Sequence, residues 1–298
     1  MSELTAQKIK IVEKTDVKET SSTNSVQTDT ARKSARWTDR FNGEFFKFLG
    51  IVFASLATGV LIWHLASKYN LNLYVDFQNV PSPGKVFDAF LGHIQTEIFF
   101  IHIGVSMRRI LISYGLAVIV GISIGLMMGR SKIAKAFIMP YIEVIRPIPA
   151  VAWIPLAILM WPTEESSIIY ITYLGALFPI ILNTLHGVEQ TPEVLVRAAR
   201  SLGATRASIF WHVVIPAALP SISAGLAIGM GVSWFSLLAG EIISGQYGIG
   251  YFTWDAYSLI NYQDIVVGML VIGLLGTAST AAIKLITSPL LKWQRFTR

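Results

Sequence analysis

Residues 194–220 read VLVRAARSLGATRASIFWHVVIPAALP, a partly polar stretch between two apolar runs that are each long enough to cross a bilayer. Strong helix formers fill the segment from Glu193 to Leu202, and Thr191-Pro192 just before it supplies an N-cap and a first-turn proline. Gly203 stands where a left-handed C′ residue would end the helix. The stretch therefore predicts a short helix, a turn and a second helix that leads back into the membrane.

The charges of this stretch agree with a helix. Glu193 lies near the positive end of the predicted helix dipole, whereas Arg197 and Arg200 lie toward its negative end. Ala198 and Ala199 leave a smooth surface that another protein could approach closely. An ordinary amphipathic connection between two spans would explain these charges, but it would not require the full spacing of the stretch.

The composition predicts a polytopic membrane protein. Only 14% of the residues are charged and 53% are hydrophobic, and the mean hydropathy is +0.56, far from a soluble average. The net charge of +6 does not indicate nucleic-acid binding, because the basic residues fall at the ends of apolar runs. The absence of cysteine excludes a disulfide framework, a thiol nucleophile and a cysteine-ligated metal site.

Six apolar runs predict six membrane-spanning helices. They cover approximately residues 48–67, 107–129, 136–161, 167–185, 217–239 and 265–287. Lysine and arginine cluster at residues 32–47, 130–135, 197–206 and 292–298, which the positive-inside rule places in the cytoplasm together with both termini. The polar residues before the first span predict a disordered tail without a cleavable signal peptide.

The predicted third span is unusual because it contains four prolines. Pro140, Pro147, Pro149 and Pro155 each remove a backbone donor and bend or break a helix. Such a break at membrane depth is tolerated only against protein or a water-filled cavity. We therefore expect the third span to be broken.

Several motifs resemble one family of transport proteins. Ala198-Ala199, three residues, Gly203, nine residues and then Val213-Val214-Ile215-Pro216 follow the "EAA" loop of binding-protein-dependent ABC importer permeases, although Arg197 replaces the glutamate of that motif. The other segments that carry the resemblance are NVPSPGKVFDAF (79–90), RPIPAVAWIPL (146–156), LFPIILNTLHGV (177–188) and AGEIISGQYGIGY (239–251). Together they resemble the permease class for nitrate, nitrite, sulfonates, taurine, cyanate or bicarbonate.

The resemblance implies an all-α polytopic membrane protein with six transmembrane helices in the type I ABC importer permease arrangement. It further implies a homodimer in a bacterial inner membrane, cytoplasmic ABC ATPase subunits that hold ATP and Mg²⁺, and a periplasmic or lipid-anchored solute-binding protein. The implied organisation is a cytoplasmic tail (1–47), a first span with an external amphipathic segment (48–106), a permease core (107–289) with a coupling loop (189–216), and a cytoplasmic C-terminus (290–298). The residues expected to couple to the ATPase are Glu193, Arg197, Ala198, Ala199, Leu202, Gly203 and Ala204.

Arg146 is the most informative charge in the apolar part of the chain. It lies about ten residues into the third span, at a depth where an ionisable group is costly unless it is paired or hydrated. One interpretation is an anion contact beside the translocation path, where Pro147 and Pro149 open the backbone. The other is a buried ion pair with Glu143, three residues earlier on the same helix face.

Three further charges lie near the predicted outer ends of spans. Arg108 and Arg109 either extend to lipid headgroups or form a positive outer rim that gathers anions. Glu241 either contacts a docked binding protein or caps a re-entrant turn, and the glycines that follow it favour the structural role. No phosphate-binding G-x-x-x-x-G-K-[ST] motif, metal-ligand spacing or nucleophile–base pair is evident, so the chain is not expected to be an enzyme or to bind a cofactor or metal itself.

A secondary transporter or channel that works without an ATPase is the alternative, because such proteins also contain broken helices near the midplane. Here one span is clearly interrupted, and the other half of the sequence has no convincing counterpart. A non-transporting membrane scaffold would leave residues 194–220 and the four prolines unexplained.

Overall fold

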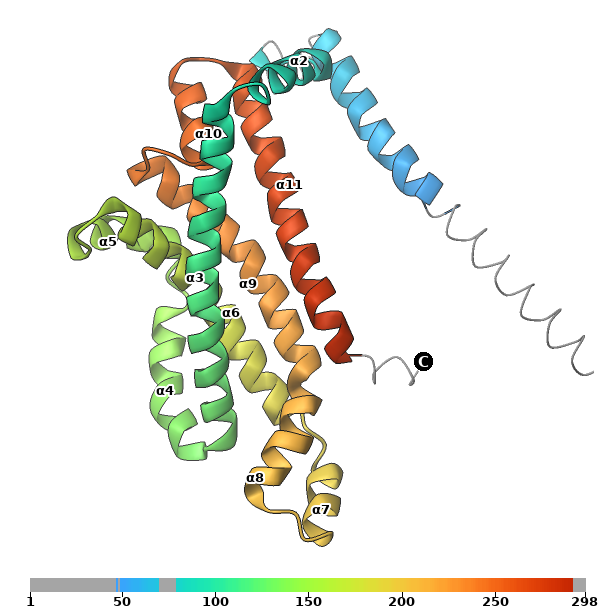
Figure 1. Ribbon diagram of the computed structural model, residues 1–298, viewed down its shortest axis with the longest axis vertical. Helices are drawn as coiled ribbons and strands as arrows, with labels where there is room; N and C mark the ends of the chain where they lie inside the picture. Colours follow the sequence, from blue (N-terminus) through green and yellow to red (C-terminus); the bar gives the residue numbers. More distant parts are fainter. Residues whose placement is uncertain (1–46, 48, 70–78, 292–298) are drawn as a thin grey trace, which may run out of the picture. The chain divides into compact units, whose positions relative to one another are not determined.

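The computed structural model describes residue 47, residues 49–69 and residues 79–291, and all of its regular structure in these ranges is helical. The chain divides into two compact units, Met1–Val75 and Asp76–Arg298. The predicted tail (1–47) and the last residues of the predicted C-terminal segment (290–298) lie almost entirely outside the described residues. Figure 1 shows the helices and their labels.

The first unit contributes one apolar helix, Leu49–Lys68, which is long enough to cross a membrane. It matches the first predicted span. Most of its residues are apolar, including Phe53 and Leu56, as expected of a helix that crosses a bilayer.

Four long helices of the second unit match predicted spans. They are α3 (Glu97–Arg130), α6 (Glu164–Glu189), α9 (Ile215–Ser244) and α11 (Tyr262–Thr287). The main difference is α3, which begins ten residues before the predicted start at Met107. At 1.5 Å per residue its 34 residues extend about 51 Å, so the helix is longer than the ~30 Å hydrocarbon core. The missed residues 98–105, IFFIHIGV, are themselves apolar, so the prediction left part of the apolar run outside the span.

The core of this unit is built by α3, α6 and α9, which pack side by side. Small residues allow the close approach. A Cβ on Gly125 of α3 would lie 2.6 Å from the Cβ of Thr184 on α6, and a Cβ on Gly175 of α6 would collide with Ser236 on α9. Replacing either glycine with a larger residue would force these helices apart, as expected for membrane helices that associate through small side chains.

The third predicted span is broken, as the prolines indicated. Helix α4 (Lys132–Ile145) is followed by a 3₁₀ turn, Ala150–Trp153, and by α5 (Ile154–Met160), and the two parts are bent by 84°. Pro147 and Pro149 lie in the break, whereas Pro140 lies inside α4. The described residues therefore contain five helices that can span a membrane, or six if the bent pair is one span.

The stretch that follows α6 forms the predicted helix, turn and helix. It contains α7 (Glu193–Ser201), α8 (Arg206–Ile209) and a π-helical turn, Phe210–Val214, that continues into α9. Gly203 has a φ of +82°, so the left-handed residue is where the sequence placed it. The predicted N-cap is wrong by one position, because Pro192 occupies it and the Thr191 hydroxyl has no hydrogen-bond partner.

The opposite end of the helical core carries two short helices, α2 (Pro83–His93) and α10 (Ile249–Ser258). Both pack against α11, and His93 Nε2 lies 2.8 Å from a carboxylate oxygen of Asp264 at the start of α11. Below, this part of the molecule is called the α10 end, and the part that contains α7 and α8 is called the α7 end (Figure 1).

Candidate functional site

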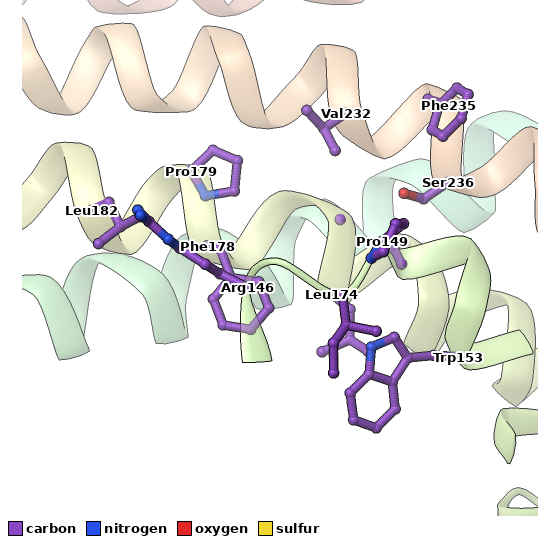
Figure 2. A pocket seen from close by; sticks show the side chains of 13 residues that line it. Arg146, Pro149, Trp153, Leu174, Phe178, Pro179, Leu182, Val232, Phe235 and Ser236 are labelled. Carbon is purple, nitrogen blue, oxygen red and sulfur yellow. The ribbon is translucent and has the colours of Figure 1, made fainter. Parts of the chain in front are cut away.

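A hollow of about 360 Å³ lies where the break after α4 meets α6 and α9. Its walls are apolar and partly aromatic, with Trp153, Phe178 and Phe235 among the lining side chains. Arg146 and Ser236 are the charged and hydroxyl side chains of the lining (Figure 2). The space therefore combines one cation with hydrophobic surface.

Arg146 lies at the C-cap of α4, where its backbone N–H donates to the Ile142 carbonyl over 2.9 Å. The residue is exposed, and its side chain is directed along α6 toward Leu182 (Figure 2). Within the described ranges no ion pair or hydrogen bond joins it to Glu143, which is also exposed. The interpretation of a buried Glu143–Arg146 pair is therefore not supported, because both residues are exposed and no contact of this kind joins them in the described ranges.

The two prolines of the break have different positions. Pro149 lines the hollow and caps the 3₁₀ turn, and its carbonyl accepts from the Ala152 N–H over 2.9 Å. Pro147 is exposed in the break and is not part of the lining. Since neither proline has an N–H to donate, the backbone can leave the helical path here without leaving a donor unpaired.

A second polar group lies buried toward the α10 end, and Arg109 is at its centre. Its guanidinium donates to Glu241 on α9 over 3.0 Å and to Glu165 on α6 over 2.6 Å, and to the Tyr247 carbonyl over 2.6 Å. Arg109 and Glu241 are only 5% and 1% exposed. Both suggested roles for Arg109, headgroup contact and outward rim, are therefore wrong.

The prediction placed Arg109 near the outer end of a helix because it began the span at Met107, whereas α3 begins at Glu97. Arg109 is twelve residues from Glu97, or about 18 Å along the helix, and is not at its outer end. Arg108, the next residue on the helix, is exposed and points away from the buried group. Successive residues of an α-helix are rotated by about 100° about its axis, so the side chains of Arg108 and Arg109 lie in different environments.

The carboxylate of Glu241 organises the loop that follows α9. It accepts hydrogen bonds from the Ser106 hydroxyl over 2.8 Å and from the Gly250 N–H over 2.9 Å. Gly248 has a φ of +125°, and any Cβ there would collide with this carboxylate. Glu241 is too buried to contact a docked protein, so it has the structural role that its glycine-rich surroundings favoured.

Two more side chains of α3 bind the same loop. The Ser106 hydroxyl accepts from the Ile249 N–H over 2.9 Å, and His102 Nδ1 accepts from the Gly248 N–H over 3.1 Å. Sequence reasoning missed Ser106, His102 and Glu165, because nothing in the local pattern relates them to a carboxylate on α9. The only sequence signal for this buried group was Arg109, an arginine among the apolar residues of α3.

At the α7 end, several apolar side chains are exposed. Val194 is 71% exposed and Leu202 is 88% exposed, and their spacing puts them on one face of α7 with Leu195 and the exposed Ala198. Ala199 and Ala204 are half-buried. Arg197 donates to Glu193 over 2.7 Å in an exposed i,i+4 ion pair, which explains locally why an arginine is accommodated there.

The turn after α7 is held by two hydrogen bonds. The Gly203 N–H donates to the Arg200 carbonyl over 3.0 Å, and the Ala204 N–H donates to the Ala199 carbonyl over 3.1 Å. This is the Schellman arrangement, which satisfies carbonyls that the helix end would otherwise leave free. The exposed face of α7 is thus presented by a well-defined turn.

Among the residues that the structure describes, no group of three or more His, Cys, Asp or Glu side chains is arranged to hold a metal ion.

Comparison with known proteins relates residues 117–293 of the chain to transport systems. Residues 117–293 match a family model described as a binding-protein-dependent transport system inner membrane component. A putative ABC transporter permease protein of Methanocaldococcus jannaschii is 34% identical over 241 residues, which cover 80% of this chain and 90% of that protein. The region that matches the family model contains both the hollow and the exposed face of α7.

Two further relatives have names that state a substrate. The nitrate import permease protein NrtB of Synechocystis sp. is 33% identical over 66% of this chain and 75% of its own length. The taurine transport system permease protein TauC of Escherichia coli is 34% identical over 64% of this chain and 70% of its own length.

Proposed function

Because the chain belongs to the family of binding-protein-dependent transport system inner membrane components, we propose that it is the transmembrane subunit of an ATP-driven importer for a small anion. It is a multi-pass permease, and it is not an enzyme by family. The anion is proposed from the names of the relatives, which transport nitrate or taurine. Arg146 in the hollow supports the same class, since it offers a cation without an ion-pair partner in the described ranges.

The exposed apolar face of α7 is the observation that carries the proposal. A soluble surface rarely leaves Val194, Leu195 and Leu202 exposed together on one short helix. The turn at Gly203 fixes this face in space. Such a face, rimmed by the charges of Glu193 and Arg197, fits a groove on a partner protein, and a cytoplasmic ABC ATPase is the partner proposed here.

The other components follow from this assignment. The sequence contains no phosphate-binding loop, so ATP and Mg²⁺ would bind to the ATPase subunits. A periplasmic or lipid-anchored solute-binding protein would deliver the anion, and a second copy of the chain would complete the permease. We place both termini in the cytoplasm of a bacterial inner membrane, with the α7 end inside and the α10 end outside.

The test uses two leucines of similar exposure at opposite ends of the molecule. Leu202→Asp puts a charge on the α7 face, whereas Leu259→Asp puts one on the α10 end, where Leu259 is 73% exposed. The tagged chain is purified together with its ATPase subunits. Leu202→Asp should lower the co-eluting ATPase by tenfold or more, which corresponds to about 1.4 kcal/mol, while Leu259→Asp should leave it unchanged.

Both variants should reach the membrane in normal amounts, because neither side chain is buried in the chain itself. If Leu202→Asp retains full ATPase binding and transport, α7 is an ordinary connection. The ATPase-independent transporter or channel would then be the better assignment.

A further inference from the structure

The short helix α2 is held against the core by one of its faces. At about 100° per residue, Val86 and His93 lie on the same side of its axis, and Val86 is buried. His93 Nε2 lies 2.8 Å from a carboxylate oxygen of Asp264. The imidazole also contacts the rings of Phe99 and Phe252, at centroid distances of 5.5 and 5.1 Å. These contacts fix the rotation of α2 about its own axis.

The rest of the surface of α2 divides into an apolar face and a polar face. Phe87, Leu91 and the C-cap residue Ile94 are exposed and fall within about 60° of one another around the axis. Lys85 and Asp88 are also exposed, but they lie about 120° from the apolar face and about 120° from the face on the core. A helix that rests on a membrane beside a protein needs these three faces, one each for protein, lipid and water.

The direction of α2 suits a position at the membrane surface. In Figure 1, α3 and α11 run along the core, whereas α2 runs across its end. Ile98 and Ile101 in the first turns of α3 are exposed as well, and α3 is long and apolar enough to span a membrane. The lipid-facing surface of α3 therefore begins within a few residues of the apolar face of α2 and continues it.

The length of α3 agrees with this level. Its 34 residues extend about 51 Å, whereas a bilayer with its headgroup regions is about 40–45 Å thick. With a tilt of about 30°, α3 reaches from one headgroup region to the other. When Arg130 lies among the headgroups on one side of the membrane, Glu97 and the adjoining α2 lie among those on the other side.

We propose that α2 is an interfacial helix that inserts Phe87, Leu91 and Ile94 into the leaflet at the α10 end, about 5–10 Å into the boundary between headgroups and acyl chains. Lys85 and Asp88 leave its polar face without net charge, so burial of apolar surface drives the contact instead of attraction to anionic lipids. The helix thereby fixes the level of the α10 end relative to the bilayer. This placement requires only that the chain spans a membrane, and it is independent of the transported solute.

The test uses single cysteines, because the natural chain contains none. Phe87→Cys, Leu91→Cys and Asp88→Cys each carry a nitroxide label, and each full chain is reconstituted in phosphatidylcholine vesicles. Electron paramagnetic resonance measures collisions of the label with oxygen, which concentrates in lipid, and with a water-soluble nickel chelate. We expect the ratio of oxygen to nickel accessibility to be several-fold higher at positions 87 and 91 than at position 88.

Two exposed leucines serve as references. Leu274→Cys on the apolar span α11 gives the value for lipid, and Leu202→Cys at the α7 end gives the value for an apolar position in water. A ratio at position 87 equal to that at Asp88 or Leu202 would place the apolar face in water and overturn the proposal. Low accessibility to both probes would show that protein, such as a second copy of the chain, covers this face, and would overturn it as well. Neither result affects ATPase binding by α7, which the Leu202→Asp experiment tests separately.

Discussion

Arg109 shows how a single buried charge can connect distant parts of a membrane protein. It binds Glu165 on α6 and Glu241 on α9 while it lies on α3. Each of these charges would be costly alone in an apolar interior, but the group also has hydrogen bonds from Ser106 and the Gly250 N–H to satisfy it. The charges therefore compensate one another, and removal of one partner leaves an uncompensated buried charge.

The first prediction compares two positions of this group, Arg109 and Glu165, with Arg108 outside it. Arg109→Ala leaves Glu241 buried without its cation and should destabilise the chain by about 3–5 kcal/mol. Glu165→Gln should cost less, because the Glu165 side chain is 36% exposed whereas that of Glu241 is 1% exposed. Arg108→Ala, the exposed neighbour, should have almost no effect. Thermal unfolding of the chain in detergent measures all three, and a stability of Arg109→Ala equal to that of Arg108→Ala would contradict the assignment.

At the scale of the element, α7 and its turn depend on one left-handed glycine. Gly203 has a φ of +82° and open space around its Cα, so only backbone conformation restricts the residue there. Gly248 also has a positive φ, but the Glu241 carboxylate fills the space beside it. Gly203 thus has a conformational requirement alone, whereas Gly248 has both a conformational and a packing requirement.

Substitution by asparagine distinguishes these requirements. Asparagine tolerates the left-handed conformation, so Gly203→Asn should preserve ATPase binding, whereas Gly203→Val should lose most of it because a β-branched residue is strained there. Gly248→Asn should destabilise the chain for two reasons: the φ of 125° and ψ of 163° lie in a region essentially restricted to glycine, and the side chain has no room. Co-purification with the ATPase measures the first pair of variants, and thermal unfolding measures the third. Equal behaviour of Gly203→Asn and Gly203→Val would argue against the role of the turn.

At the scale of the molecule, the helices define two ends with different chemistry. The α7 end carries Lys132, Arg206 and the exposed face of α7, and the α10 end carries the short helices that pack on α11. The basic residues at the α7 end agree with a cytoplasmic location under the positive-inside rule. The broken span lies between these ends and lines the hollow.

The orientation can be tested by cysteine labelling, because the natural chain contains no cysteine. Thr163→Cys and Leu259→Cys should react with a membrane-impermeant maleimide in intact cells. Ser201→Cys and Arg206→Cys should react only after the membrane is opened. Labelling of Arg206→Cys in intact cells would place α7 outside and remove the basis for an ATPase at that site.

The sequence by itself determined the features that depend on neighbouring residues and on the thickness of the bilayer. It predicted the apolar spans, the break among four prolines, the helix after Pro192 and the left-handed Gly203, because hydropathy, missing donors and backbone sterics act over a few residues. The error at α3 has another origin, since the missed residues 98–105 (IFFIHIGV) are themselves apolar and were assigned to the segment before the span.

The tertiary structure alone decided which charges meet. Arg109 is 56 residues from Glu165 and 132 from Glu241, and no local pattern encodes such pairs. In the same way, only the packing of the broken span against α6 and α9 could determine that Arg146 lines the hollow. An ionisable side chain in a membrane protein follows the partners and the space that folding brings to it, so its role is fixed by contacts between distant segments and not by its position along the chain.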